Sequence, residues 1–234
     1  MELKAAICPN CGGDLRLPED KKVLKCMYCG KDIIVSEAIE KAVGPAVENY
    51  LVIAKTALNA RNYKEAYDYY NKILELNPMN HEAWLGKAES VGWQSTFAES
   101  KIPEMMANFE NALRCCPAQI KNDFKVKSVL RIENVLIACF NSDTYYTRQW
   151  GTGNQICSNS AQLADALESL HKLLPANKQI LDGVIEVLKR QVAFANESYR
   201  STLNLKLNQY VAKRQALNPK YVPPPSKPKR FNLF

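Results

Sequence analysis

Four of the eight cysteines in this 234-residue sequence lie near its start as two Cys-x-x-Cys pairs. Cys8 and Cys11 form the first pair, and Cys26 and Cys29 form the second after fourteen intervening residues. A glycine follows each pair, and glycine can adopt the positive φ that turns backbone amides toward sulfur. Four thiolates at this spacing are typical of tetrahedral zinc sites. We therefore predict that these cysteines bind a structural Zn²⁺ ion.

Two other roles for these thiols fit the pattern less well. A redox Cys-x-x-Cys usually occurs once, beside a βαβ pattern, and the sequence shows no such pattern here. A catalytic zinc ion keeps an open coordination position, which four thiolates would fill. Short segments around the cysteines ("DLRL", "KVLKC" and "KDIIV") are typical of strands. Residues 1–35 resemble the zinc-ribbon family, which implies a small β module that folds around its metal.

A nucleic-acid role for this module is not favoured by its charge. Residues 1–35 contain six Lys and Arg side chains and five acidic ones. Four thiolates and one Zn²⁺ would lower the net charge to about −1. A module without surplus positive charge binds phosphate poorly.

A helical repeat pattern follows a predicted linker at residues 36–46, where Gly44-Pro45 should break helix continuity. Aromatic and small residues recur 34 positions apart, as in Tyr50 and Trp84 or Ala54 and Ala88. The segment resembles the tetratricopeptide repeat, on Tyr50, Ala54, Ala66, Tyr70 and Pro78 in the first unit and Trp84, Gly86, Ala88, Phe109, Ala112 and Pro117 in the second. Met105 stands where the family has a small residue. A third, degenerate unit is predicted to pair a helix at 123–140 with one at 161–175, across a long connection at 141–160 that contains Cys157.

This resemblance implies a mainly α fold. Residues 47–217 would form a right-handed superhelix beside the small β zinc ribbon, with a concave face that binds a protein or peptide. The positions that would line the concave face include Lys55 and Asn59 but also acidic residues. We therefore expect an apolar or mixed peptide as ligand, rather than the C-terminal carboxylate of a chaperone that some members of the family bind. The candidate contacts are Leu51, Lys55, Leu85 and Trp93. The alternative is that these side chains pack against the ribbon or the next helix.

The C-terminal end is strongly basic. From Lys189 onward there are ten Lys and Arg side chains and one acidic residue, Glu197. Apolar residues recur every 3.6 positions between Asn177 and Leu217, which predicts one long helix. A Pro-rich basic tail follows at 218–234. Phe231, Leu233 and Phe234 suggest that the tail docks on a partner or on a second copy; the alternative is a disordered tail.

The basic end also supports an alternative function in nucleic-acid association, or a weaker one at an anionic membrane surface. The residues that would contact nucleic acid are Arg200, Lys206, Lys213, Arg214, Lys227, Lys229 and Arg230.

The sequence shows no pattern typical of catalysis. Its two histidines, His81 and His171, are far apart, and Gly151-Thr-Gly153 lacks the preceding strand of a phosphate loop. No apolar run approaches the roughly 18 residues that span a bilayer, so we expect no integral membrane segment. The start lacks a secretory apolar region, which favours a cytoplasmic protein whose paired cysteines bind metal. We therefore predict a cytoplasmic, non-enzymatic adaptor or scaffold that mediates protein–protein interaction.

Overall fold

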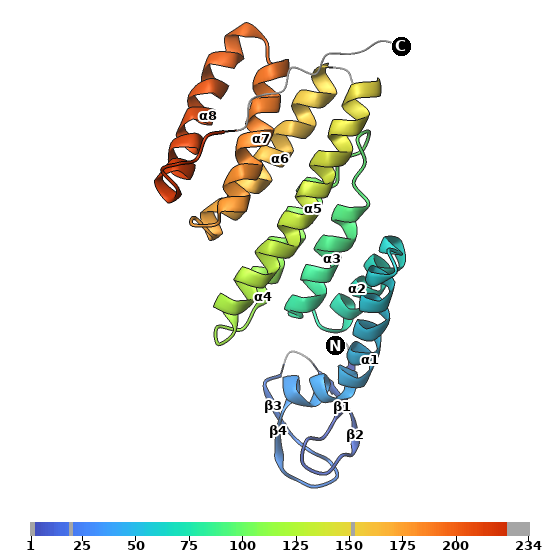
Figure 1. Cartoon of the computed structure of the whole chain (residues 1–234). Helices are drawn as coiled ribbons and strands as arrows, with labels where there is room; N and C mark the ends of the chain where they lie inside the picture. The colour runs from blue at the N-terminus through green and yellow to red at the C-terminus, as the bar shows by residue number, and fades with distance from the viewer. Residues whose placement is uncertain (1–2, 19–20, 151–152, 224–234) are drawn as a thin grey trace.

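The computed structural model describes residues 3–18, 21–150 and 153–223 of the chain. These residues form a mainly helical protein with a small antiparallel strand region at the N-terminal end, as Figure 1 shows. The strands are β1 (Leu3–Ile7), β2 (Asp14–Pro18), β3 (Val23–Lys25) and β4 (Asp32–Ile34). The helices are α1 (Val35–Asn59), α2 (Tyr63–Leu76), α3 (His81–Trp93), α4 (Ile102–Cys115), α5 (Lys121–Trp150), α6 (Gly153–Leu173), α7 (Lys178–Phe194) and α8 (Glu197–Leu217).

Two short hairpins build the N-terminal module. β1 pairs antiparallel with β2, and β3 pairs antiparallel with β4. Their inward side chains form a small core with the first turns of α1, consisting of Ala6, Cys8, Leu15, Leu17, Cys26, Ile33, Val35 and Ala38. A core of this size supplies little folding free energy by itself, so such modules commonly depend on a metal.

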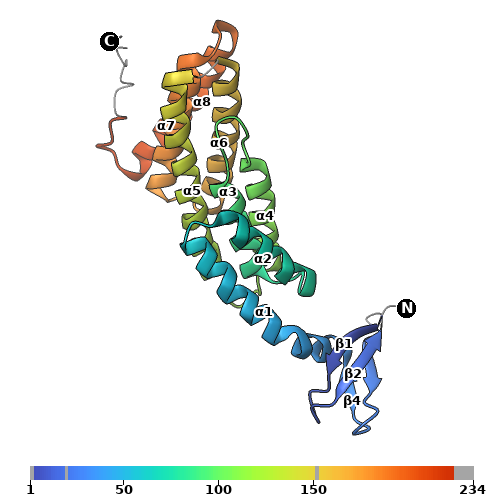
Figure 2. The same ribbon diagram turned by 90° about the vertical axis from the view of Figure 1, so that its right-hand side faces the viewer.

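The predicted helix break at Gly44-Pro45 is wrong, because both residues lie inside α1. A proline in a helix interior costs about 3 kcal/mol through a lost hydrogen bond and a clash with the preceding turn. Packing at both ends of α1 offsets this cost. Val35 and Ala38 are buried in the N-terminal module, and Ala54 is buried against the next helix. Figure 2 shows α1 running without interruption from the strands into the helical body.

Small residues let neighbouring helices of the body approach closely. Ala54 and Ala66 are fully buried between α1 and α2. A methyl group added at Gly86 of α3 would overlap the ring of the buried Tyr70 on α2. This contact explains in physical terms why position 86 holds a glycine.

Met105 also has a clear place in the packing. Its side chain is fully buried between helices. A Cβ atom on Gly92 of α3 would overlap the Met105 sulfur, so Gly92 provides the space that the larger residue on α4 needs. The small Gly92 and the large Met105 thus fill one space between α3 and α4 together.

The predicted long connection at 141–160 is wrong, because helix occupies most of it. α5 extends to Trp150 and α6 begins at Gly153. The first turns of α6 are anchored to the loop between α3 and α4: the Asn159 side-chain amide donates to the Phe97 carbonyl oxygen at 3.0 Å, and the Ser100 hydroxyl bonds with Gln162. Contacts distant in sequence thus stabilise helix in a segment whose local pattern did not predict it.

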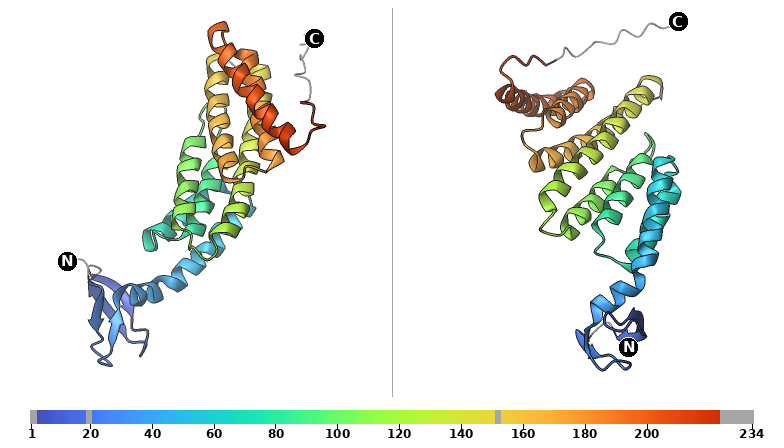
Figure 3. Two further views of the ribbon diagram at one scale, coloured as in Figure 1. Left: turned by 90° about the vertical axis from the view of Figure 1, so that its left-hand side faces the viewer. Right: turned by 60° about the horizontal axis from the view of Figure 1, so that its bottom comes forward.

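The single long helix predicted for 177–217 is divided in two. α7 ends at Phe194, and α8 begins at Glu197 and packs back against α7 (Figure 3). The Asn196 side chain accepts a hydrogen bond from the backbone amide of Tyr199 at 3.0 Å, which caps the start of α8. Arg200 donates to the Ala195 carbonyl oxygen at 2.8 Å and stabilises the turn. The two helices therefore form a hairpin rather than a projecting rod.

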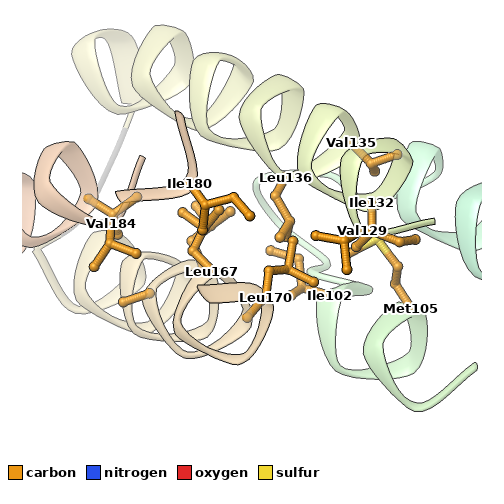
Figure 4. Close-up of a cluster of buried hydrophobic side chains, with 14 of the residues drawn as sticks. Ile102, Met105, Val129, Ile132, Val135, Leu136, Leu167, Leu170, Ile180 and Val184 are labelled. Carbon is orange, nitrogen blue, oxygen red and sulfur yellow. The ribbon is translucent and has the colours of Figure 1, made fainter. Parts of the chain in front are cut away.

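One continuous apolar core runs through the body from α3 to α8. Figure 4 shows part of it, where side chains from several helices interdigitate; those labelled are Ile102, Met105, Val129, Ile132, Val135, Leu136, Leu167, Leu170, Ile180 and Val184. A second cluster joins α1, α2 and α3. Within the described ranges, no helix combines the length and apolar character needed to cross a bilayer.

Candidate metal centre

Two equivalent turns present the four cysteines. In the first, the amide of Gly12 donates to the carbonyl oxygen of Cys8 at 2.9 Å, and in the second Gly30 donates to Cys26 at the same distance. Gly12 and Gly30 have φ values of 76° and 69°, a region that glycine occupies without strain. Each turn closes the end of a strand pair, so the two hairpins place both Cys-x-x-Cys pairs side by side.

The four sulfur atoms form one compact group. All four Sγ atoms lie within 4.8 Å of one another, and the Cys8–Cys29 and Cys11–Cys26 separations are both 3.8 Å. A regular tetrahedron with Zn–S bonds of about 2.3 Å has edges of about 3.8 Å. A disulfide would instead require about 2.05 Å, and these cysteines are free thiols. The prediction that these four cysteines can hold a metal ion is therefore confirmed by their geometry.

The local electrostatics also fit a cation. The backbone amide of Lys31, helped by the Asn10 side chain, lowers the pKa of Cys29 to about 6. The Gly13 amide favours the thiolate of Cys11, but bonds with Cys8 and the other thiols outweigh it and raise the pKa of Cys11 to about 12. Several thiolates this close repel one another, so all four can ionise together only with a positive ion between them.

Three residues that the sequence analysis did not single out support this centre. The Asn10 side-chain amide points at Cys29 Sγ, 3.5 Å away, and its oxygen accepts a hydrogen bond from Lys31 Nζ at 2.9 Å. Lys41 of α1 donates to the Pro9 carbonyl oxygen at 3.5 Å. Asn10 thus links the two cysteine turns. In the sequence, this role of Asn10 could be found from its position between Cys8 and Cys11, the two ligands in one turn.

The metal centre has one buried and one accessible side. Cys8 and Cys26 are buried in the small core, whereas Cys11 is exposed and Cys29 half-buried.

The four predicted partner contacts are not all accessible. Leu85 is only 2% exposed and belongs to the main core, so its prediction as a contact is wrong. The reason is that α5 packs across α3. Leu51 is half-buried against the cluster of the first two helices. Lys55 forms an ion pair with Glu82 at 2.7 Å, and Trp93, which is 38% exposed, stacks on Tyr63. Lys55 and Trp93 remain accessible.

The four basic residues of α8 that were considered for nucleic acid have partners within the fold. Lys206 forms an ion pair with Glu168 at 2.6 Å, and Arg214 with Asp182 at 2.8 Å. Arg200 bonds with the turn before α8, as described above, and Lys213 lies over the Tyr210 ring at 4.2 Å from its centroid. The ion pairs of Lys206 and Arg214 hold α8 on α6 and α7.

The remaining candidates lie outside the described residues: Lys227, Lys229, Arg230, Phe231, Leu233 and Phe234.

Comparison with known proteins gives no further guide. No family model matches the chain, and no curated protein matches it.

Proposed function

We propose that this protein is a non-enzymatic, zinc-binding scaffold of the cytoplasm that holds a protein or peptide partner on its helical body. The observation that carries the proposal is the role of α1 in both parts of the molecule. Val35 and Ala38 belong to the core of the cysteine module, and Ala54 belongs to the first helical cluster. Folding of the metal module is thereby joined to the orientation of a helix of the body.

Zinc is the metal best suited to this site. Thiolate sulfur is a soft ligand, and Zn²⁺ accepts four thiolates in the tetrahedral arrangement that the 3.8 Å sulfur separations fit. Four protein ligands leave no position for water or substrate, so the ion would stabilise the fold rather than act in a reaction.

The helical body supports the scaffold role through its packing. Close helix pairs with glycine or alanine at the crossing, such as Gly86 against Tyr70, are typical of tetratricopeptide-like repeats. We infer a right-handed superhelix of this kind. Folds of this kind mostly bind proteins or peptides, and the accessible Lys55 and Trp93 lie on the helices that would line the concave face.

Two measurements test this function. Elemental analysis of the purified protein should find one zinc ion per chain, and Cys11→Ser should lose it while Cys139→Ser, a half-buried cysteine outside the centre, should retain it. Affinity purification from the source cell should recover a protein partner with the wild type. A strictly monomeric protein that retains no partner, or one that folds at its N-terminal end without metal, would contradict the proposal.

A further inference from the structure

A groove of about 960 Å³ lies where the cysteine module meets the helical body. Its walls come from β3 and β4, from the first half of α1, from the turn between α2 and α3, and from the end of α4. Figure 1 shows the strands below the turn that joins α2 to α3. The groove is distinct from the concave-face contacts discussed above, because it contains none of them.

The walls of the groove carry four large apolar side chains that are exposed. Val23 and Ile34 form a cross-strand pair on the outer face of the β3–β4 hairpin and are 54% and 46% exposed. Leu76 and Met79, from the end of α2 and the following turn, are 37% and 64% exposed. Contiguous exposed apolar surface of this kind marks interaction sites. Four large apolar side chains in one groove therefore indicate an occupant with apolar side chains of its own.

Two lysines lie at one end of the groove. Lys21 and Lys22 line it, and among the described residues neither forms an ion pair. α1 also begins here at Val35, with Ile34 at the N-cap position, where no side chain accepts from the first-turn amides. The helix dipole favours a negative group at a helix start. The Val35 amide itself donates to the Lys22 carbonyl oxygen at 3.0 Å, and Glu37 lies in the first turn. Glu40, the acidic residue of the described lining, lies further along α1.

We propose that this groove binds an extended peptide segment of a partner protein that combines apolar side chains with carboxylates. The apolar side chains would pack between the Val23–Ile34 pair and Met79, and a carboxylate would lie near Lys21, Lys22 and the start of α1. The inference rests on the proposed scaffold function and adds a partner site at the module junction to the concave face of the helical body. Because the cysteine module supplies one wall, binding requires the metal-loaded protein.

The test is a selection of random twelve-residue displayed peptides on the full-length, zinc-loaded protein. Enriched peptides should contain both apolar and acidic residues, and their binding should weaken as salt rises. Met79→Glu should reduce their affinity at least tenfold. Val52→Glu is the matched control, because Val52 has nearly the same exposure, 65%, but lies on α1 away from the groove.

Charge reversal supplies a second comparison. Lys21→Glu with Lys22→Glu should weaken binding several-fold, whereas Lys178→Glu with Lys220→Glu, the same charge change at exposed sites elsewhere, should not. Bound peptide should also slow alkylation of Cys115, which lines the groove, and leave Cys139 unaffected.

Several outcomes would overturn the groove proposal: no enrichment, enrichment of basic peptides, equal binding to Met79→Glu and wild type, or self-association that Met79→Glu abolishes. In the last case the occupant is a second copy. The scaffold function is tested separately: a partner recovered equally by wild type and Met79→Glu would overturn the groove and leave the scaffold function standing.

Discussion

Glu89 of α3 and Arg131 of α5 form a bidentate ion pair. Arg131 Nε donates to one carboxylate oxygen of Glu89 at 2.7 Å, and Arg131 Nη2 donates to the other. The Glu89 side chain is buried, whereas Arg131 is half-exposed. Burial raises the pKa of Glu89, and the bonds from Arg131 act against that rise. The pair joins α3 to α5 one turn along α3 from Leu85, which the sequence analysis predicts to contact a peptide.

Arg131→Met should destabilise the protein by about 2 kcal/mol, because it leaves the Glu89 carboxylate buried without its partner. Chemical denaturation measures this loss. Lys64→Met, which removes an exposed ion pair with Asp68, should change the free energy of unfolding by less than about 0.5 kcal/mol. Equal effects of the two substitutions would show that Glu89 does not depend on Arg131.

Gly86→Ala should destabilise the protein by about 1–3 kcal/mol, because the added methyl group overlaps the buried Tyr70 ring. Gly183→Ala is the matched control. Gly183 also lies inside a helix, α7, but the nearest atom to the position its Cβ would take is a Leu167 methyl carbon at 3.5 Å, an ordinary van der Waals contact. That substitution should instead stabilise the protein by about 0.5–1 kcal/mol. Thermal unfolding of both variants measures the difference in sign; destabilisation by both would contradict the packing argument.

Asn10→Ala should weaken zinc affinity by roughly tenfold, because residues that hydrogen-bond to the ligands of a metal site typically contribute this much to its affinity. The mechanism is loss of the Asn10 contacts with Cys29 and Lys31. Competition with a chromophoric chelator measures the affinity, and Asn49→Ala, at an exposed position on α1, should leave it unchanged.

Removal of the metal should unfold the cysteine module first. Its small core has few apolar residues to hold it, whereas the body has a continuous core of its own. Amide NMR signals of residues 3–34 should therefore collapse on chelation, and those of α5 to α8 should persist. Retention of the N-terminal signals in metal-free protein would contradict the role assigned to the ion.

His171 should make stability depend on pH below neutrality. Burial, followed by the nearby Lys213, lowers the pKa of His171, although Glu168 acts in the opposite direction. In the unfolded chain the His171 side chain has a pKa of about 6.5 and takes up a proton more readily than in the folded protein. Stability is therefore lost as the pH falls through that value. His171→Phe retains a ring beside Tyr210 and should unfold with a shallower pH dependence between pH 7 and 5. Parallel pH profiles for the two proteins would count against this assignment.

The cysteine centre was predictable because its ligands are determined by local spacing. Two residues between the cysteines of each pair and a following glycine fix the turn, and the hairpins need only bring two such turns together. The small residues of the first helices were predictable for a similar reason: a buried Ala54 or Gly86 follows from how closely helices approach.

The division of the C-terminal helix was not predictable from periodicity. The 3.6-residue pattern continues across Asn196, because α7 and α8 both bury apolar residues in the same core. Asn196 caps the start of α8 with its side chain. This capping residue indicates where the helix divides, but the uninterrupted 3.6-residue pattern of apolar residues does not. The continuity of α1 and the burial of Leu85 depend on packing between distant segments, which a local pattern does not contain.

The unbroken α1 has a geometric consequence for binding. A helix of 25 residues spans about 37 Å. It sets the distance between the cysteine module and the first helix pair, so a ligand that contacts both meets a fixed separation rather than the fluctuating one of a flexible tether. Engagement of the second end then costs no loop-closure entropy, and avidity depends on whether the ligand's own two epitopes match that span.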